Sequence, residues 1–261
     1  MPGQALQLYT LREFTKTADA LRDTLARVRE IGFRAVQVSA VAALESDIAP
    51  DELGQLLSEL DILCIATHRP WTSLLTETER EIALHKAIGC DYVAIGGIPD
   101  GYDKLNPAEY QRFLRESLAV RTKLADSGIR FGHHNHAFEF DRGAVGADVS
   151  PWDVLINEGG EHYYLELDVY WAWHGGVDPV TLFSRMYGRV PVVHIKDKAV
   201  IEGNPVMAPI GEGNLPWGSI IQAGNSAGVE WWCVEQDECH RDAFASVAAS
   251  YRYLKEVNGL L

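Results

Sequence analysis

Ionisable side chains stand near the ends of short apolar segments in the second half of the sequence. Three of them, Asp168, His194 and Glu235, are of types that bind Mg²⁺, Mn²⁺ or Co²⁺ through carboxylate oxygens and neutral imidazole nitrogens. Each also has a structural explanation on its own: Asp168 as a helix cap, His194 as a core histidine, and Glu235 as an ion-pair partner of Arg241. Together they are hard to explain by stability alone, because a buried charge without a partner is costly. The pattern indicates a site for one divalent metal ion.

The elements that must position these residues alternate along the chain, as short apolar segments followed by longer segments of helical period. This alternation predicts parallel strands joined by crossover helices. The predicted strands are Leu6–Tyr9, Ala35–Val38, Ile62–Thr67, Tyr92–Gly96, Arg130–His136, Tyr163–Asp168, Val190–Lys196 and Glu230–Glu235. The predicted helices are Asp19–Ile31, Pro50–Leu60, Glu77–Ile88, Pro107–Asp126, Asp178–Tyr187, Trp217–Ala227 and Arg241–Val257.

The length of 261 residues is typical of an eight-stranded (β/α)₈ TIM barrel of the α/β class. We expect a single domain over residues 1–261, with a doubly wound open sheet as the alternative. In such a barrel the C-terminal ends of the strands carry function. Side-chain alternation places Glu166 with Asp168, and His194 with Lys196, on the same face of their strands. Carboxylates and imidazoles therefore collect at one mouth.

Composition excludes several classes of protein. The formal net charge of -14 repels nucleic acid and anionic membrane surfaces, so we expect neither as a partner. No stretch approaches the length of apolar residues that a membrane span needs, and the N-terminal residues do not resemble a signal peptide. The four cysteines are far apart and are interpreted as reduced thiols. We expect a cytoplasmic protein.

Several motifs resemble those of the xylose-isomerase-like TIM barrels that are grouped as sugar phosphate isomerases/epimerases. They are GHHNHAFEF (132–140), LELDVYWAWHGG (165–176), VVHIKDK (192–198), GEGNLPW (211–217) and CVEQDE (233–238), with looser agreement at QLYTLR (7–12) and at the Ala-Thr-His of 66–68. Members of this family usually bind one divalent ion, Mn²⁺, Mg²⁺ or Co²⁺, through Glu, Asp, His and Glu on the last four strands.

The resemblance implies that Asp168, His194 and Glu235 are three of the metal ligands. For the fourth ligand, the usual glutamate position holds His134, and the nearest carboxylate is Glu139. We expect Glu139 to be the fourth ligand if the backbone bends after strand five, with His134 as the alternative.

The other polar residues at the mouth are expected to bind substrate. They are Tyr9, His68, His136, Trp171 and Lys196. Lys196 alternatively pairs with its neighbour Asp197, and Trp171 alternatively serves packing only. Glu166 is expected to support the ligands from behind, and Glu212 to lie near the pocket. His133, His174 and His240 are interpreted as structural.

The resemblance implies an enzyme acting on a sugar or keto-sugar by removing a proton next to a carbonyl group, through an enediolate. Return of the proton gives isomerisation or epimerisation, which we place first. Loss of a β-substituent gives a dehydratase or lyase on inososes or 3-keto-glycosides, and the histidines of strand five favour this alternative. The candidate catalytic residues are His134, as general base, Glu139 and Glu235.

Two other classes remain as minor alternatives. An abasic-site endonuclease shares this barrel but needs more metal ligands and a phosphate-binding surface, and a degenerate sugar-binding subunit needs no metal. A nicotinamide dehydrogenase is disfavoured because no GxGxxG follows the first strand. Aromatic residues near Trp71 and Trp152 are compatible with a homo-oligomer.

Overall fold

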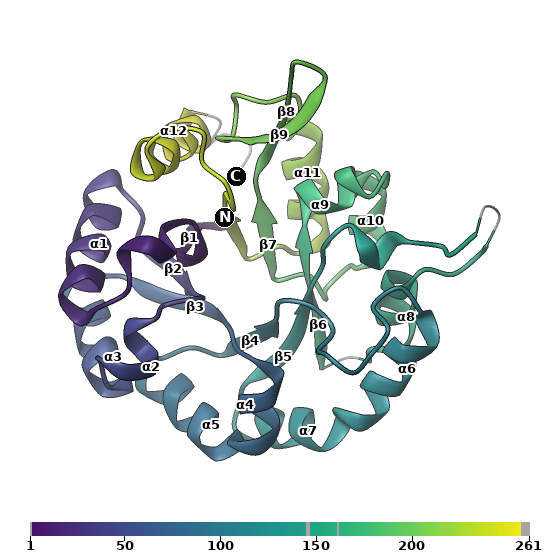
Figure 1. Ribbon diagram of the computed structural model, residues 1–261, viewed down its shortest axis with the longest axis horizontal. Helices are drawn as coiled ribbons and strands as arrows, with labels where there is room; N and C mark the ends of the chain where they lie inside the picture. Colours follow the sequence, from purple (N-terminus) through teal and green to yellow (C-terminus); the bar gives the residue numbers. More distant parts are fainter. Residues whose placement is uncertain (1, 145–146, 161, 257–261) are drawn as a thin grey trace.

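Eight parallel strands form a closed barrel at the centre of this computed structural model, which describes residues 2–144, 147–160 and 162–256 (Figure 1). Around the barrel the order is β1, β10, β7, β6, β5, β4, β3 and β2. The strand bounds are Gly3–Gln7 (β1), Ala35–Val38 (β2), Leu63–His68 (β3), Tyr92–Ile95 (β4), Arg130–His134 (β5), Tyr163–Asp168 (β6), Val192–Ile195 (β7) and Trp231–Val234 (β10). Because the strands are parallel, all their carboxyl ends lie at one mouth.

Helices surround the barrel on its outside (Figure 1). They are the 3₁₀ helices Leu8–Phe14 (η1) and Phe138–Phe140 (η2), and the α-helices Ala18–Ile31 (α1), Ala43–Ser46 (α2), Pro50–Glu59 (α3), Trp71–Thr76 (α4), Thr78–Ala87 (α5), Pro107–Glu116 (α6), Leu118–Asp126 (α7), Pro151–Glu158 (α8), Val169–His174 (α9), Pro179–Arg185 (α10), Trp217–Ala227 (α11) and Ala243–Glu256 (α12). Side chains of Thr17, Asn106 and Ser150 accept hydrogen bonds from backbone N–H groups at the starts of α1, α6 and α8. Among the described residues, no helix has the length and apolar character required to cross a membrane.

The interior of the barrel contains small apolar side chains below a polar layer. Ala5, Ala66 and Ala94 pack there with the ring of Tyr164. A Cβ atom at Gly132 would lie 2.6 Å from this ring, so the lack of a side chain at Gly132 leaves space for the ring of Tyr164. The larger apolar side chains fill the layer between the sheet and the helices. This arrangement leaves the carboxyl ends of the strands free for polar residues.

Strand register brings the polar residues of neighbouring strands side by side. His134 of β5 pairs with Glu166 of β6, and Asp168 of β6 pairs with His194 of β7. His194 in turn pairs with Cys233 of β10, two residues before Glu235. Side chains that are far apart in the sequence therefore lie on adjacent strands.

The predicted strands are all present, but five of them end earlier than predicted, β4, β7 and β10 by one residue and β1 and β5 by two. Strand β1 ends at Gln7 because η1 begins directly after it, where the Gln7 side chain accepts a hydrogen bond from the backbone N–H of Tyr9. Strand β5 ends at His134, and the chain then turns into η2. The predicted strand ends at Tyr9 and His136 were therefore wrong.

Some elements were not predicted. An antiparallel hairpin of Asp197–Ile201 (β8) and Asn204–Ala208 (β9) follows β7 outside the barrel. Its exposed Val200 and Ile201 give no pattern of a buried face. Helix α8 was also missed, although its start carries a capping box of Ser150 and Asp153. The predicted helix Pro107–Asp126 is two helices, and the end predicted at Val257 lies outside the described residues.

Candidate metal centre

Four buried donor groups meet at the carboxyl-terminal mouth of the barrel. They are the imidazoles of His134 and His194 and the carboxylates of Asp168 and Glu235, and their candidate ligand atoms all lie within 4.8 Å of one another. His134 ends β5, Asp168 ends β6, His194 lies in β7 and Glu235 directly follows β10. The structure therefore brings together the three ligands expected from both strand position and resemblance, and adds His134.

Lys196 is a buried cation that pairs with these carboxylates. Its Nζ atom lies 3.0 Å from Oδ2 of Asp168, 2.6 Å from Oε2 of Glu235 and 2.9 Å from Oδ1 of Asp237. Oε2 of Glu235 also lies 2.9 Å from Nδ1 of His194. One ammonium group thus faces three carboxyl groups, one of which also faces His194. Asp197, the alternative partner considered for Lys196, takes part in none of these three ion pairs.

The electrostatics of the cluster fit a cation. Burial, together with the charge of Glu235, raises the pKa of Asp168 to about 7 against the opposing effect of Lys196. Burial and Glu235 also raise the pKa of Asp237. Oδ2 of Asp168 accepts no hydrogen bond, although the Lys196 ammonium lies beside it, and Nδ1 of His134 has no partner either. An ion would satisfy the Asp168 oxygen, and Nε2 of His134 lies 3.8 Å from that oxygen.

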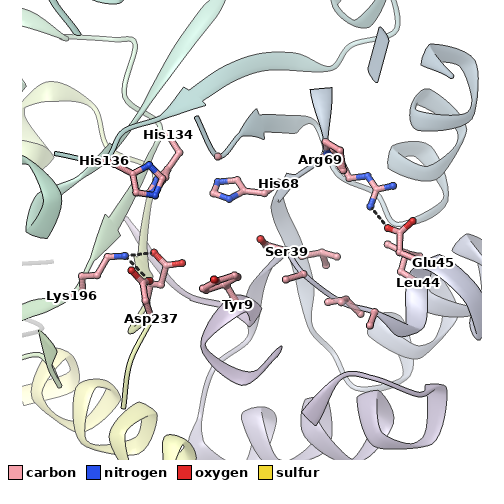
Figure 2. A pocket seen from close by; sticks show the side chains of 17 residues that line it. Tyr9, Ser39, Leu44, Glu45, His68, Arg69, His134, His136, Lys196 and Asp237 are labelled. Atoms are coloured by element: carbon pink, nitrogen blue, oxygen red, sulfur yellow. Dashed lines mark hydrogen bonds and ion pairs between the residues drawn. The ribbon is translucent and has the colours of Figure 1, made fainter. Parts of the chain in front are cut away.

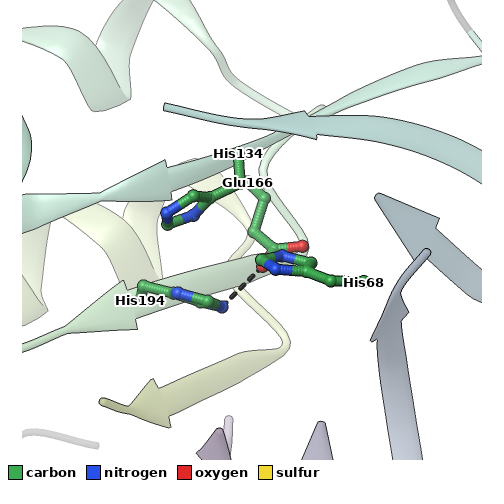
Figure 3. A group of neighbouring side chains, drawn as sticks. All are labelled: His68, His134, Glu166 and His194. Carbon is green, nitrogen blue, oxygen red and sulfur yellow. Dashed lines mark hydrogen bonds and ion pairs between the residues drawn. The ribbon is translucent and has the colours of Figure 1, made fainter. Parts of the chain in front are cut away.

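Glu166 supports His194 from the side away from Glu235. Its Oε1 atom lies 2.5 Å from Nε2 of His194 and 2.8 Å from Nε2 of His68 (Figure 3). The same oxygen accepts a hydrogen bond of 2.7 Å from Gln37. Tyr164 donates to Oε2 at 3.2 Å. Burial alone would raise the pKa of Glu166, but His68 and His194 outweigh this effect and hold the pKa well below its ordinary value.

The surroundings of His194 decide which of its nitrogens can bind a metal ion. Nε2 faces two acceptors, Oε1 of Glu166 and Oε1 of Gln37 at 2.6 Å, so Nε2 carries a proton. Nδ1 is then the nitrogen that faces Glu235 and the carboxylate cluster. Burial would lower the pKa of His194, but Glu235 and Glu166 overcome it and raise the pKa to about 10.

A second group of donors overlaps the first. The candidate ligand atoms of His68, His134, Glu166 and His194 also lie within 4.8 Å of one another (Figure 3). Its carboxylate, however, is already bonded on both oxygens by side chains of the protein. The group that contains Asp168 and Glu235 fits an ion better, because it includes Oδ2 of Asp168, which accepts no hydrogen bond, whereas His134 is shared by both groups.

Glu139 lies outside both groups. Its carboxylate is completely buried, accepts a 2.7 Å hydrogen bond from the backbone N–H of His136, and lies 3.2 Å from Nε2 of His133. The turn into η2 directs Glu139 toward His133, which is on the opposite face of β5 from His134. The structure therefore does not bring Glu139 to the cluster as expected, and it places His134 there.

A cavity of about 660 Å³ opens over the cluster. Four of the five residues expected to bind substrate line it, namely Tyr9, His68, His136 and Lys196 (Figure 2). Trp171 is not in the lining; its ring lies 5.6 Å from both the His136 ring and Nζ of Lys196.

His136 has a buried nitrogen, Nδ1, without a hydrogen-bond partner. Burial lowers its pKa, against the effect of Glu139, so the ring is neutral at physiological pH. Its ring stacks on Phe138 at 5.3 Å and lies 5.2 Å from the ring of His134. A neutral imidazole at the wall of the cavity can accept a proton.

Three functional candidates, Asp237, Gln37 and Arg69, were given no role from the sequence. Asp237 lies two residues after Glu235, so the alternation of side chains along a strand could have placed it on the same face. The pairing of Gln37 with His194 and the position of Arg69 in the cavity lining depend on contacts between distant segments, which the sequence does not show. Glu212, expected near the pocket, instead pairs with Arg241 at 2.8 Å.

Asp197 organises the loop that follows the hairpin. Its carboxylate accepts hydrogen bonds from the backbone of Gly211, Gly213 and Leu215 and from the Trp217 indole. This role explains why it does not pair with Lys196.

Comparisons with solved structures give the same barrel. A sugar phosphate isomerase/epimerase from Parabacteroides distasonis has a TM-score of 0.80 at 19% identity, covering 100% of this chain and 96% of its own. The IOLI protein with a bound zinc atom has a TM-score of 0.73 at 15% identity, covering 99% of each chain. A probable 3-DHS dehydratase from Bacillus anthracis, involved in petrobactin synthesis, has a TM-score of 0.74 at 15% identity, covering 98% and 99%.

The sequence comparison with curated proteins finds no match. The family described as Xylose isomerase-like TIM barrel matches residues 25–257 of the chain. This chain therefore belongs to the xylose isomerase-like TIM barrel family.

Proposed function

We propose that this protein is a divalent-metal-dependent sugar isomerase or epimerase that acts on a keto-sugar. The observation that carries the proposal is the buried cluster of His134, Asp168, His194 and Glu235, whose candidate ligand atoms lie within 4.8 Å of one another beneath a large cavity. The names of structural neighbours, among them a sugar phosphate isomerase/epimerase, support a sugar as the substrate class.

The four residues of the cluster would hold the ion, with His194 binding through Nδ1. We expect Mn²⁺, Mg²⁺ or Co²⁺, and the zinc-bound neighbour adds Zn²⁺ to the metals to be tested. When bound, such an ion supplies Lewis acidity that makes a C–H bond beside a carbonyl group more acidic. His134 then serves as the fourth ligand in place of Glu139.

Proton transfer falls to side chains outside the ligand set. The imidazole of His136, which lines the cavity, would take the proton from carbon, leaving the electron pair in the enediolate, and would return the proton to the neighbouring carbon for isomerisation. Lys196 would donate hydrogen bonds to the developing oxyanion, because its ammonium group lines the same cavity. Burial by itself would lower the pKa of Lys196, but Asp168, Glu235 and Asp237 raise it and keep the group charged.

A second candidate is elimination from an inosose or a 3-keto-glycoside. It is favoured by the imidazole of His136 beside the ammonium of Lys196, since a site with one base and one hydrogen-bond donor can remove a proton and stabilise a leaving oxygen. Epimerisation, by contrast, usually needs proton transfer at both faces of the carbon.

Proton NMR in D₂O tests these alternatives. Metal-free and Mn²⁺- or Mg²⁺-loaded protein would be incubated with ketoses, inososes and 3-keto-glycosides. Metal-dependent deuterium uptake at one carbon supports the proposal, and the product identifies the outcome. Absence of exchange with every substrate in the loaded protein would contradict the proposal.

A further inference from the structure

The cavity extends well beyond the candidate metal centre. His134, His136, Lys196 and Asp237 lie together at one end (Figure 2). The other end, here called the distal half, is lined by Ser39, Ala40, Leu44, Glu45, Arg69 and Pro70. These residues come from the segment after β2, from α2 and from the segment after β3. A substrate bound at the cluster would thus leave a second, separately built region open.

The volume of the cavity supports this division. Its 660 Å³ corresponds to about twenty water molecules at ~30 Å³ each. A single sugar ring fills only a fraction of this space. The remainder is bounded by the segments after β2 and β3 and by α2, so a larger substrate could occupy it.

The charges in the distal half favour a neutral group. Nε and Nη2 of Arg69 lie 2.8 and 2.9 Å from the two carboxylate oxygens of Glu81, and Nη1 lies 2.8 Å from Glu45. Among the described residues that line the cavity, Arg69 and Lys196 are the permanent cations, and each is already paired with two or more carboxylates. A phosphate or carboxylate on the substrate would therefore find no uncompensated positive charge.

The same surface combines polar and apolar groups as sugar recognition requires. Glu45 keeps 59% of its side chain exposed while bonding Arg69, so its carboxylate can accept from hydroxyl groups. Ala40, Leu44 and Pro70 offer apolar surface for the C–H face of a ring. Ala40 has a φ of 52°, a conformation that costs a non-glycine residue roughly 1–2 kcal/mol and that is held by the surrounding fold.

We infer that the distal half is a binding site for a second, neutral sugar ring, so that the substrate is a keto-glycoside rather than a free monosaccharide. The inference rests on the proposed function for the position of the reacting ring. It is independent of whether that ring is isomerised or loses its glycosidic substituent.

The test compares a keto-sugar methyl glycoside with the corresponding keto-disaccharide. Calorimetry on metal-loaded protein measures affinity, and NMR measures turnover. We expect the disaccharide to bind about tenfold more tightly, as one or two net hydrogen bonds would provide. Equal affinities, or no measurable binding of the disaccharide, would overturn the inference. Failure of the proposed function would appear differently, as binding without deuterium uptake.

A pair of variants locates the effect. Ala42 is exposed, lines the cavity and has an ordinary helical conformation, so Ala42→Trp should fill the distal half without disturbing the fold. We expect it to abolish the advantage of the disaccharide and leave methyl glycoside affinity unchanged. Ser46→Trp, at the end of the short helix that begins directly after Ala42 but outside the lining, is the control and should change neither affinity. If Ala42→Trp leaves the disaccharide advantage intact, or weakens both ligands equally, the inference is wrong.

Discussion

Nε2 of His194 lies 2.5 Å from Oε1 of Glu166, and both side chains are completely buried. The carboxylate thereby fixes the ring orientation and places the proton on Nε2, leaving Nδ1 toward Glu235. Carboxylate–histidine pairs of this kind raise the basicity of a metal-binding imidazole. Glu166 is therefore a positioning residue.

Replacing Glu166 with Gln should weaken metal binding by about 10- to 100-fold, the usual effect of losing such a partner. Metal titration by calorimetry measures the change. Glu212→Gln is a matched control because Glu212 pairs with Arg241 at the surface, away from the cluster. Unchanged metal affinity in Glu166→Gln would show that the ring of His194 needs no such support.

His134 and Glu139 give opposite expectations. His134→Gln should lose bound metal and activity together, because the His134 imidazole lies within the donor cluster. Glu139→Gln should keep the metal, since Glu139 contacts His133 and the backbone of His136 instead. Metal content by atomic absorption distinguishes them. Retention of metal by His134→Gln with loss of activity would restore His134 as the general base.

His136→Gln should retain metal and lose turnover by about 10²- to 10⁴-fold, the usual contribution of a general base. His174→Gln is the comparison, because His174 is exposed on α9 and is not in the cavity lining. Steady-state kinetics and deuterium exchange measure the effect. Normal exchange in His136→Gln would assign proton transfer to another group.

Lys196→Met should destabilise the metal-free protein by about 3–5 kcal/mol, because it leaves buried carboxylates without their cation. Added Mn²⁺ should then raise the melting temperature of the variant by more than that of the wild type, since a divalent ion can neutralise the same carboxylates. Thermal unfolding with and without metal provides the measurement. An equal shift in both proteins would argue that the ion binds away from Lys196.

Metal affinity should rise with pH through neutrality. In the metal-free protein the pKa of Asp168 is about 7 and that of His194 about 10, so both groups carry protons below those values. An ion must displace these protons, and acid therefore favours the metal-free state. Calorimetry in buffers on either side of pH 7 should show weaker binding and greater proton release at the lower pH. Affinity that does not vary with pH would exclude Asp168 and His194 as ligands.

Local patterns in the sequence determined much of this molecule. The period-two alternation of β6 and β7 places Glu166 and Asp168, and His194 and Lys196, toward the barrel interior, because strand side chains alternate whatever lies around them. The succession of short apolar segments and helices likewise predicts the closed barrel, whose strands must bury both faces.

Contacts between distant segments were decided only by the tertiary structure. Glu139 and His134 are equally plausible ligands in sequence, but the turn into η2 directs one toward His133 and leaves the other at the mouth. Lys196 reaches across to Asp237, while the adjacent Asp197 is drawn to the loop around Gly211. Which of these side chains meet depends on the distance between separate elements in the folded chain. The sequence pattern carries no information on that distance.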